Sequence, residues 1–298
     1  MKTIHFVPLL LLLGIISCQK NQTPKEYVQE LVQELLYIAN NENGFDIMRN
    51  DTSGQNETKF TNGLGWEWGP QFVVAKNEVY YNSTDTASTF IFQNSNRKGE
   101  VLNSIITPDS MGYDISPDGK WMLFSQKIGE STQLILAPYA MPIDSQQITN
   151  NNAYNGRAKW SNDSKKIAYL SDESGSNEIY IYSMETQEHQ RITNNDLREK
   201  YLSWSADDSK LATTMKTDST ENEIYLIDLN TLEVEQLTNT PINESEIACS
   251  PDGKFIAYHA QVDEKDDIYL LNISNRQLKI ITDGRVYVGE PAWIWTKK

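Results

Sequence analysis

The chain is organised by an internal repeat, which constrains its fold more than any other feature. Four copies of a short turn motif contain serines that are 45, 44 and 45 residues apart, namely Ser116, Ser161, Ser205 and Ser250. A fixed period of this length indicates a stacked or circular repeat architecture, in which each copy buries its apolar face against its neighbours.

Each copy predicts four short strands. In the second copy, residues 166–170 are expected to form one strand, and residues 178–182 alternate as a half-buried strand does. The turn at 116–119 reads Ser-Pro-Asp-Gly, in which Pro presets φ and Gly tolerates a positive φ. The fourth strand of each copy is expected to end in an apolar residue followed by threonine, at Thr149, Thr193, Thr238 and Thr282. Four antiparallel strands per repeat are typical of a β-propeller blade.

The number of copies predicts six blades over residues 35–298. An earlier copy begins at 70–73, and a last copy begins at 291–294 with only four residues after it. We expect the missing strands of that last copy at the front of the chain, at 35–38, 45–49 and 57–61. A C-terminal strand would then join the N-terminal blade and leave no unpaired sheet edge at the seam.

The segment 27–39 has two interpretations. Its apolar spacing suits a single amphipathic helix, or a short helix or linker followed by a strand from about Leu35. Periodicity alone does not separate the two in so short an apolar run.

The first 34 residues predict export and a lipid anchor. A basic start and an apolar run at 4–16, broken only by His5, form a signal peptide over 1–17. Residues 15–18 resemble the bacterial lipobox, which implies that Cys18 becomes the acylated first residue of the mature chain and that residues 18–34 form a tether. The alternative is an ordinary secreted protein with an incidental cysteine. No acidic run follows Cys18, which favours the periplasmic side over the cell surface.

Charge and motif spacing exclude several functions. The net charge of −15, from 26 basic and 41 acidic residues, argues against a nucleic-acid partner. With Cys18 lipidated, Cys249 is the only remaining thiol, and its place at the Trp160 position predicts a buried apolar role. His189 and His259 belong to no metal-binding spacing, and no nucleophile elbow or phosphate loop is present. No catalytic residue, metal or cofactor is therefore predicted.

The candidate binding face consists of the loops that join the fourth strand of one blade to the inner strand of the next. These are expected at 62–70, 108–114, 150–158, 194–202, 239–246 and 283–290. They carry aromatic and arginine side chains, which give contact area at low entropy cost: Trp66, Trp68, Tyr113, Tyr154, Arg157, Arg198, Tyr201, Arg285 and Tyr287. Alternatively, such tyrosines simply fill a narrowing channel.

The repeat W-S-x-D-x-K-x-I-A-Y, followed by N-E-I-Y and L-T-N signatures at 160–194 and 204–239, resembles the WD-like propeller repeat of the TolB family. The resemblance implies a six-bladed propeller in the bacterial periplasm that serves as a protein-interaction module of the cell envelope. TolB has an additional N-terminal α/β domain, which we expect to be absent here because about 16 residues separate Cys18 from the first blade. Similar propellers occur in prolyl-oligopeptidase-like peptidases, for whose hydrolase domain the chain has no room. They also occur in oligogalacturonate lyases, whose channel histidines are not reproduced here.

The expected function is a lipid-anchored, non-catalytic envelope propeller that binds a protein or peptide. The alternatives are a carbohydrate-binding propeller that uses the same aromatic side chains, or a polysaccharide lyase or hydrolase that uses carboxylates in the channel.

Overall fold

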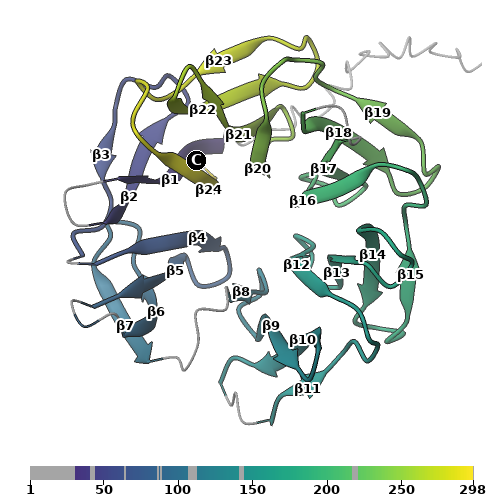
Figure 1. Cartoon of the computed structure of the whole chain (residues 1–298). Coiled ribbons are helices and arrows are strands. Elements are labelled where there is room, and N and C mark those ends of the chain that lie inside the picture. Colours follow the sequence, from purple (N-terminus) through teal and green to yellow (C-terminus); the bar gives the residue numbers. More distant parts are fainter. Residues whose placement is uncertain are drawn as a thin grey trace, which may run out of the picture.

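The chain forms a closed ring of six four-stranded antiparallel sheets around a central axis (Figure 1). The computed structural model describes residues 31–40, 44–63, 65–85, 87, 89–106, 113–140, 144–216 and 221–297. The predicted six-bladed β-propeller is confirmed. Among the described residues, no helix is long and apolar enough to cross a membrane.

Each blade is described from its inner to its outer strand. The seam blade comprises β24 (Val288–Lys297), β1 (Leu31–Asn40), β2 (Phe45–Asp51) and β3 (Thr58–Lys59). Blade 2 comprises β4 (Glu67–Val73), β5 (Glu78–Thr84), β6 (Phe90–Ser95) and β7 (Val101–Ile106). Blade 3 comprises β8 (Asp114–Ile115), β9 (Trp121–Ile128), β10 (Ser131–Pro138) and β11 (Gln146–Gln147).

The remaining blades follow the same order. Blade 4 comprises β12 (Asn155–Trp160), β13 (Lys166–Ser171), β14 (Glu178–Ser183) and β15 (His189–Arg191). Blade 5 comprises β16 (Arg198–Trp204), β17 (Lys210–Lys216), β18 (Glu223–Asp228) and β19 (Val234–Gln236). Blade 6 comprises β20 (Glu244–Cys249), β21 (Phe255–Val262), β22 (Lys265–Asn272) and β23 (Leu278–Ile280).

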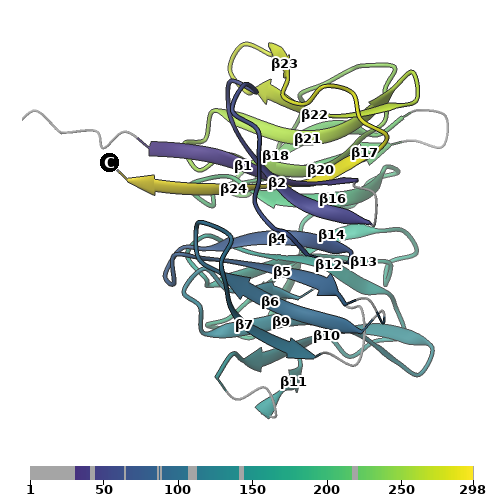
Figure 2. The same ribbon diagram turned by 90° about the vertical axis from the view of Figure 1, so that its left-hand side faces the viewer.

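The seam joins the two ends of the chain as predicted. β24 pairs antiparallel with β1, with Leu31 opposite Lys297 and Leu35 opposite Trp293, and Figure 2 shows both strands projecting from the same side of the ring. β1 begins at Leu31 rather than near Leu35, so a helix over 31–39 is wrong. The apolar spacing of this segment fitted either a helix or a strand. Its hydrogen bonds to β24 on one side and to β2 on the other make it a strand. The predicted signal peptide (1–17), Cys18 and the tether as far as residue 30 lie outside the described residues.

The blades pack through repeated aromatic side chains. At one repeat position the tyrosines are at most 3% exposed, namely Tyr37, Tyr81, Tyr169 and Tyr258, and Phe124 is half-buried there. At the other, the indole N–H groups of Trp204 and Trp293 each donate to a backbone oxygen of the preceding blade, at 3.0 Å. Cys249, at the tryptophan position of blade 6, is half-buried, and burial raises the pKa of its thiol to about 11.

The repeated turns lie at one end of the ring, which we call the turn face; the end where the inner strands begin is the loop face. In blade 4 the Ser161 hydroxyl donates to Asp163 (2.7 Å) and accepts from the Lys166 N–H (2.9 Å). The same serine–aspartate lock recurs at Ser116, Ser205 and Ser250. The repeat motif is therefore explained by the hydrogen bonds of one turn.

Each apolar-threonine signature directly follows the fourth strand rather than ending it, so the threonine lies two residues after the last residue of the strand. The threonine hydroxyl accepts the N–H of a residue at the start of the third strand, as Thr193 does from Ile179 at 2.8 Å. Equivalent bonds are made by Thr61, Thr149, Thr238 and Thr282. This bond holds the end of the blade against its own third strand, next to the loop face.

Candidate binding site in the central channel

The inner strands share a β-bulge that turns one side chain toward the axis. The pairing of β12 with β13 shifts between Gly156 and Lys159, and β16, β20, β4 and β24 shift at the equivalent place. Bulges re-aim side chains and are common beside functional sites. We call the residues at this position the bulge ring: Gly69, Arg157, Tyr201, Glu246 and Glu290. All but Tyr201 have φ between 50° and 64°. The equivalent residue of blade 3 lies outside the described residues.

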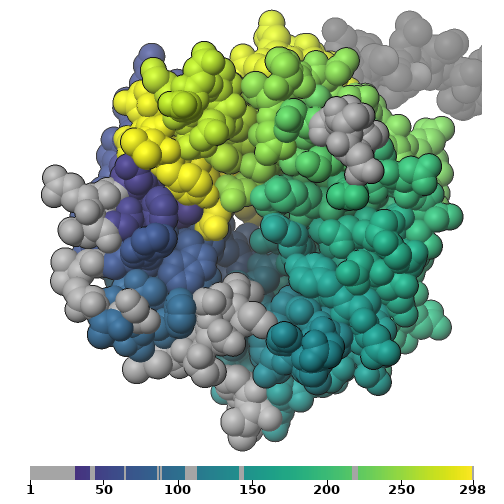
Figure 3. Space-filling view, viewed as in Figure 1, coloured from purple at the N-terminus to yellow at the C-terminus, as the bar shows by residue number. Residues whose placement is uncertain are grey.

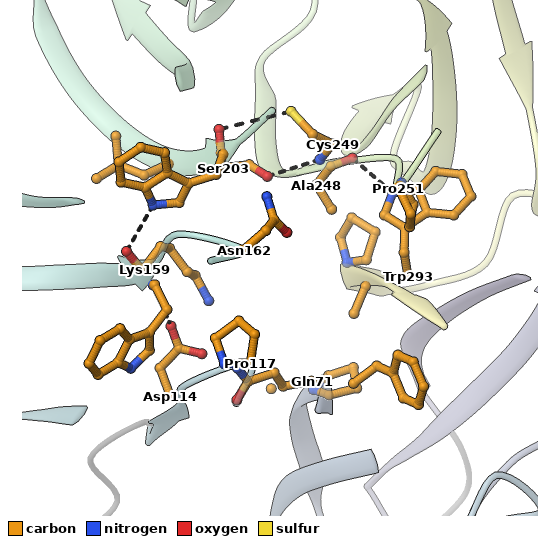
Figure 4. A pocket seen from close by; sticks show the side chains of 18 of the residues that line it. Gln71, Asp114, Pro117, Lys159, Asn162, Ser203, Ala248, Cys249, Pro251 and Trp293 are labelled. Carbon is orange, nitrogen blue, oxygen red and sulfur yellow. Dashed lines mark hydrogen bonds between the residues drawn. The ribbon is translucent and has the colours of Figure 1, made fainter. Parts of the chain in front are cut away.

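The bulge ring lines a cavity of about 1030 Å³ on the axis. The space-filling view shows the centre of the ring as a hollow (Figure 3). The lining continues from the bulge ring past Asp114 and Lys159 to Pro117 and Pro251 in the turns. Figure 4 shows these four residues around the channel: Asp114 and Pro117 come from blade 3, Lys159 from blade 4 and Pro251 from blade 6.

Neighbouring bulge residues contact one another around the ring. The Glu246 carboxylate accepts the Glu290 N–H at 2.8 Å, and the Glu290 carboxylate accepts the Gly69 N–H. On the other side, the Arg157 guanidinium lies 4.6 Å from the centre of the Tyr201 ring, a cation–π contact. These contacts hold the side chains in place before any ligand arrives.

The channel is electrically polarised. Blade 4 contributes Arg157 and Lys159, whereas blade 6 and the seam blade contribute Glu246 and Glu290. Lys200 of blade 5 lies 5.2 Å from the centre of the Tyr201 ring. Burial, with the charge of Glu246, raises the pKa of Glu290 to about 7. Burial and the neighbouring Arg157 lower the pKa of Lys200. The acidic side of the channel therefore loses charge as the pH falls below neutrality.

A second layer of side chains links neighbouring blades next to the bulge ring, on the side toward the turn face. The Gln71 amide accepts the Ile115 N–H at 2.7 Å, and the Ser203 hydroxyl accepts the Cys249 N–H at 2.9 Å. The Asp114 carboxylate is buried and accepts the Trp160 N–H at 3.3 Å. Burial raises the pKa of Asp114, although nearby Lys159 opposes this. This layer fixes the channel wall.

Four of the nine sequence-predicted residues line the channel: Trp68, Tyr113, Arg157 and Tyr201. Trp68, Arg157 and Tyr201 lie on the inner strands themselves, where loops were expected, and so does Arg198 at the start of β16. The expectation of long loops was wrong because the bulge breaks the alternating pattern by which a strand is recognised. Arg198 is exposed.

Trp66 and Tyr287 form an aromatic cluster at the rim of the loop face with Phe45 of the seam blade. The Phe45 ring centre lies 4.9 Å from Trp66 and 5.1 Å from Tyr287. Trp66 remains 55% exposed. Tyr154 is also exposed, and its hydroxyl lies directly over Gly156.

Arg285 lies at the seam rather than in the channel wall. Its guanidinium forms ion pairs with Glu57 and with Asp283, and Tyr37 donates to the same Glu57 carboxylate. Arg285 thus ties the connection before β24 to the N-terminal part of the seam blade.

Sequence reasoning missed the acidic half of the channel. Glu246 and Glu290 stand at the ends of two predicted loop ranges, but only aromatic and arginine residues were selected there. Aligning the five copies at the bulge would have brought both glutamates to the Arg157 position, 44 residues apart.

The two described histidines lie in different blades and contact protein groups. His189 bonds the Tyr169 hydroxyl and the Ile148 carbonyl, each at 2.9 Å. His259 lies between Ser245 (2.8 Å) and Asp266 (2.6 Å). Within the described part of the chain, no three or more His, Cys, Asp or Glu side chains are grouped to hold a metal ion.

Comparison with known proteins places the chain in a family. Residues 114–297 match the model of the TolB beta propeller domain. No match was found among curated proteins.

Solved structures share the fold. TolB from Acinetobacter baumannii has a TM-score of 0.71 and 21% identity over 87% of this chain, which spans 66% of the length of that chain. A putative TolB from Agrobacterium tumefaciens has a TM-score of 0.66 and 14% identity over 90% of this chain and 99% of its own. An oligogalacturonate lyase in complex with manganese has a TM-score of 0.58 and 15% identity, over 84% of this chain and 73% of its own. The chain belongs to the TolB β-propeller family.

Proposed function

We propose that this chain is a lipid-anchored protein of the bacterial cell envelope that binds a peptide segment of another envelope protein at the loop-face mouth of its channel, without catalysis. The family supports an envelope role, and Cys18 would supply the anchor on the periplasmic side. The binding residues would be the bulge ring together with Trp66, Tyr113 and Tyr154 at the rim.

The observation that carries the proposal is the direction in which the chain enters the ring. Leu31 pairs with Lys297, at the turn-face end of the seam blade, whereas Asn40 at the other end of β1 reaches the loop face. A tether from Cys18 would therefore have to join the ring at Leu31 on the turn face, and its 13 residues could span at most about 45 Å. The mouth formed by the bulge ring then faces away from the membrane and is open to a partner.

The chemistry of the mouth suits a peptide. Its wall offers Arg157 and Lys159 to carboxylates, Glu246 and Glu290 to amino groups, and Tyr201 to apolar side chains. The bulge contacts preorganise these groups, which reduces the entropy cost of binding.

The test is crosslinking and capture from envelope extract with the anchored protein. We expect the Trp66→Ala/Arg157→Ala variant to lose the captured partner. The matched control is Lys165→Ala/Lys254→Ala on the turn face, whose side chains are 72% and 71% exposed, and it should retain the partner.

Two outcomes would contradict the proposal. Equal capture by both variants would remove the loop face as the binding surface. Binding of the wild type to a glycan array, lost in Trp66→Ala/Arg157→Ala, would instead assign the carbohydrate-binding alternative, to which the 55% exposed Trp66 could offer a stacking platform.

A further inference from the structure

Three blade interfaces bury a pair of acidic side chains. Each pair combines an acid at the start of a third strand with a glutamate at the start of the next blade's inner strand. We call them interface acid pairs: Asp46 with Glu67, Glu178 with Glu199, and Glu223 with Glu244. All six side chains are at most 7% exposed.

Shared partners show that the two acids of a pair lie together. Between blades 4 and 5, Asn195 donates its backbone N–H to Glu178 (3.4 Å) and its side-chain amide to Glu199 (2.9 Å). Between blades 5 and 6, Thr240 donates its N–H to Glu223 (2.9 Å) and its hydroxyl to Glu244 (3.1 Å).

The signature threonine completes each site. Thr61 donates to Glu67 and Thr238 donates to Glu244, while both hydroxyls accept a backbone N–H. Thr193 occupies the same place beside Glu199. Each threonine stands six residues before its glutamate, so the pairs are a recurrent feature of the fold.

The cationic side chains near the pairs, as far as the structure describes them, are too few to neutralise both acids of each pair. Lys59 lies 2.6 Å from Asp46, and Arg191 lies 3.1 Å from Glu178, which leaves one excess negative charge at each of those interfaces. At the interface of blades 5 and 6 the equivalent residue is Gln236, whose amide bonds the Thr238 carbonyl.

Within the described parts of the chain, the other groups facing the pairs add no positive charge. Tyr81 faces Glu67, and Tyr258 faces both Glu223 and Glu244; burial first, and these carboxylates second, raise the pKa of both phenols. Two neighbouring buried carboxyls cannot both ionise cheaply.

Several buried carboxyl oxygens in these pairs have no hydrogen-bond donor among the described residues. One is Asp46 Oδ1, at the interface of the seam blade and blade 2. The other two are Glu178 Oε2 and Glu199 Oε2, which belong to the two partners of the pair between blades 4 and 5. An unpartnered carboxylate oxygen at such a site is costly, whereas a carboxyl proton would satisfy it.

The interface of blades 3 and 4 provides a neutral version of the same site. There the two positions are Gln133 and Asn155, joined by an amide hydrogen bond of 3.4 Å, and Gln147 stands where Arg191 stands in blade 4. Two uncharged amides thus occupy the place of two acids, as expected if the acid pairs also avoid full ionisation.

We propose that the propeller holds one proton at each of three blade interfaces, on Glu67, Glu199 and Glu244, so that closure of the ring is linked to pH. Each proton-bearing glutamate lies two residues before a bulge residue, namely Gly69, Tyr201 or Glu246. The proton therefore anchors the strands that carry the channel lining.

The direction of the pH effect follows from burial. Burial, aided by the acidic neighbour, raises the pKa of Glu199 and Glu244 from 4.5 to about 7, and raises the pKa of Glu67. Between those values the folded state binds more protons than the unfolded state. Stability therefore falls as the pH rises from about 4.5 to 7, and levels off above.

The test measures the unfolding equilibrium by urea titration at pH 5 and pH 8. From the values for Glu244, we expect its site alone to change the equilibrium constant by roughly 70-fold between these conditions. The Glu244→Gln and Glu199→Gln variants imitate the protonated acid. In each variant the change of the unfolding equilibrium constant between pH 5 and pH 8 should be smaller than in the wild type by about that factor. The exposed Glu233→Gln should retain the full pH dependence.

A reciprocal variant strengthens the test. Gln133→Glu/Asn155→Glu should create a fourth acid pair and increase the pH dependence of the unfolding equilibrium. A variant that folds at pH 5 but not at pH 8 would support the proposal equally. An infrared carboxylic-acid band of the wild type at pH 6, lost in part in Glu244→Gln, would detect the proton directly.

Two results would overturn the proposal. One is an unchanged pH dependence in both Glu244→Gln and Glu199→Gln. The other is full recovery of stability at pH 8 on addition of calcium chloride, because a metal ion rather than a proton would then bridge the acids.

Discussion

The two faces of the propeller use the same repeat in opposite ways. On the turn face, the serine–aspartate lock recurs in blades 3 to 6 with nearly the same hydrogen bonds. On the loop face, one backbone bulge recurs in five blades but carries glycine, arginine, tyrosine and two glutamates. Identical geometry with identical side chains points to a structural role. A shared bulge with different side chains points to recognition.

The largest expected effect tests whether the repeat works only as a closed ring. Deleting residues 288–298 removes β24 and leaves β1 without its inner partner. We expect the shortened chain to lose cooperative folding, because the apolar seam cluster around Leu35 and Trp293 is opened to water. Thermal unfolding followed by circular dichroism measures this, and a melting temperature equal to that of the intact chain would refute it.

A smaller loss of stability is expected on the turn face. Ser161→Ala removes a fully buried hydroxyl that serves Asp163 and the Lys166 N–H, at a cost of about 1–3 kcal/mol. Urea unfolding measures the cost, and partner capture should be unchanged. Loss of capture without loss of stability would reverse the roles assigned to the two faces.

On the loop face, Glu290→Gln should change the pH dependence more than the stability. The amide oxygen can still accept the Gly69 N–H, while the carboxyl with its pKa raised to about 7 is removed. Since Glu290 is only half-buried, we expect the free energy of unfolding of the variant to exceed that of the wild type by no more than about 1 kcal/mol at pH 8. At pH 4 we expect the two free energies to be equal. Equal effects at both pH values would show that the carboxyl does not titrate in this range.

The smallest effect on folding is expected from Arg157→Ala. The residue makes one cation–π contact with Tyr201, worth about 0.5 kcal/mol at an exposed site. Partner binding should nevertheless fall at least several-fold, as measured by titration of the captured partner. If the variant unfolds readily, Arg157 has a structural role, like the serines and aspartates of the turn face.

The sequence predicted the ring because its hydrogen bonds are local and repeated. The lock at Ser161 and the bond of Thr193 each join residues at most 14 apart, so their spacing is visible in every copy. The seam was predictable from the same repeat, because the last copy is incomplete and the front of the chain supplies its missing strands.

The site was only partly predictable because it depends on where the strands bulge. Arg157 and Tyr201 were selected by residue type, whereas Glu246 and Glu290 were not. The interface acid pairs were also missed, although a threonine followed six residues later by glutamate recurs at Thr61, Thr193 and Thr238.

The order of the strands in the seam blade has a consequence for biogenesis. A ribosome makes β1, β2 and β3 first, but β24, which completes their sheet, is made only after the strands of all the other blades. The inner edge of β1 therefore stays unpaired until β24 has been made. Prematurely terminated products would therefore carry that unpaired edge, which marks them for capture by chaperones or for proteolysis.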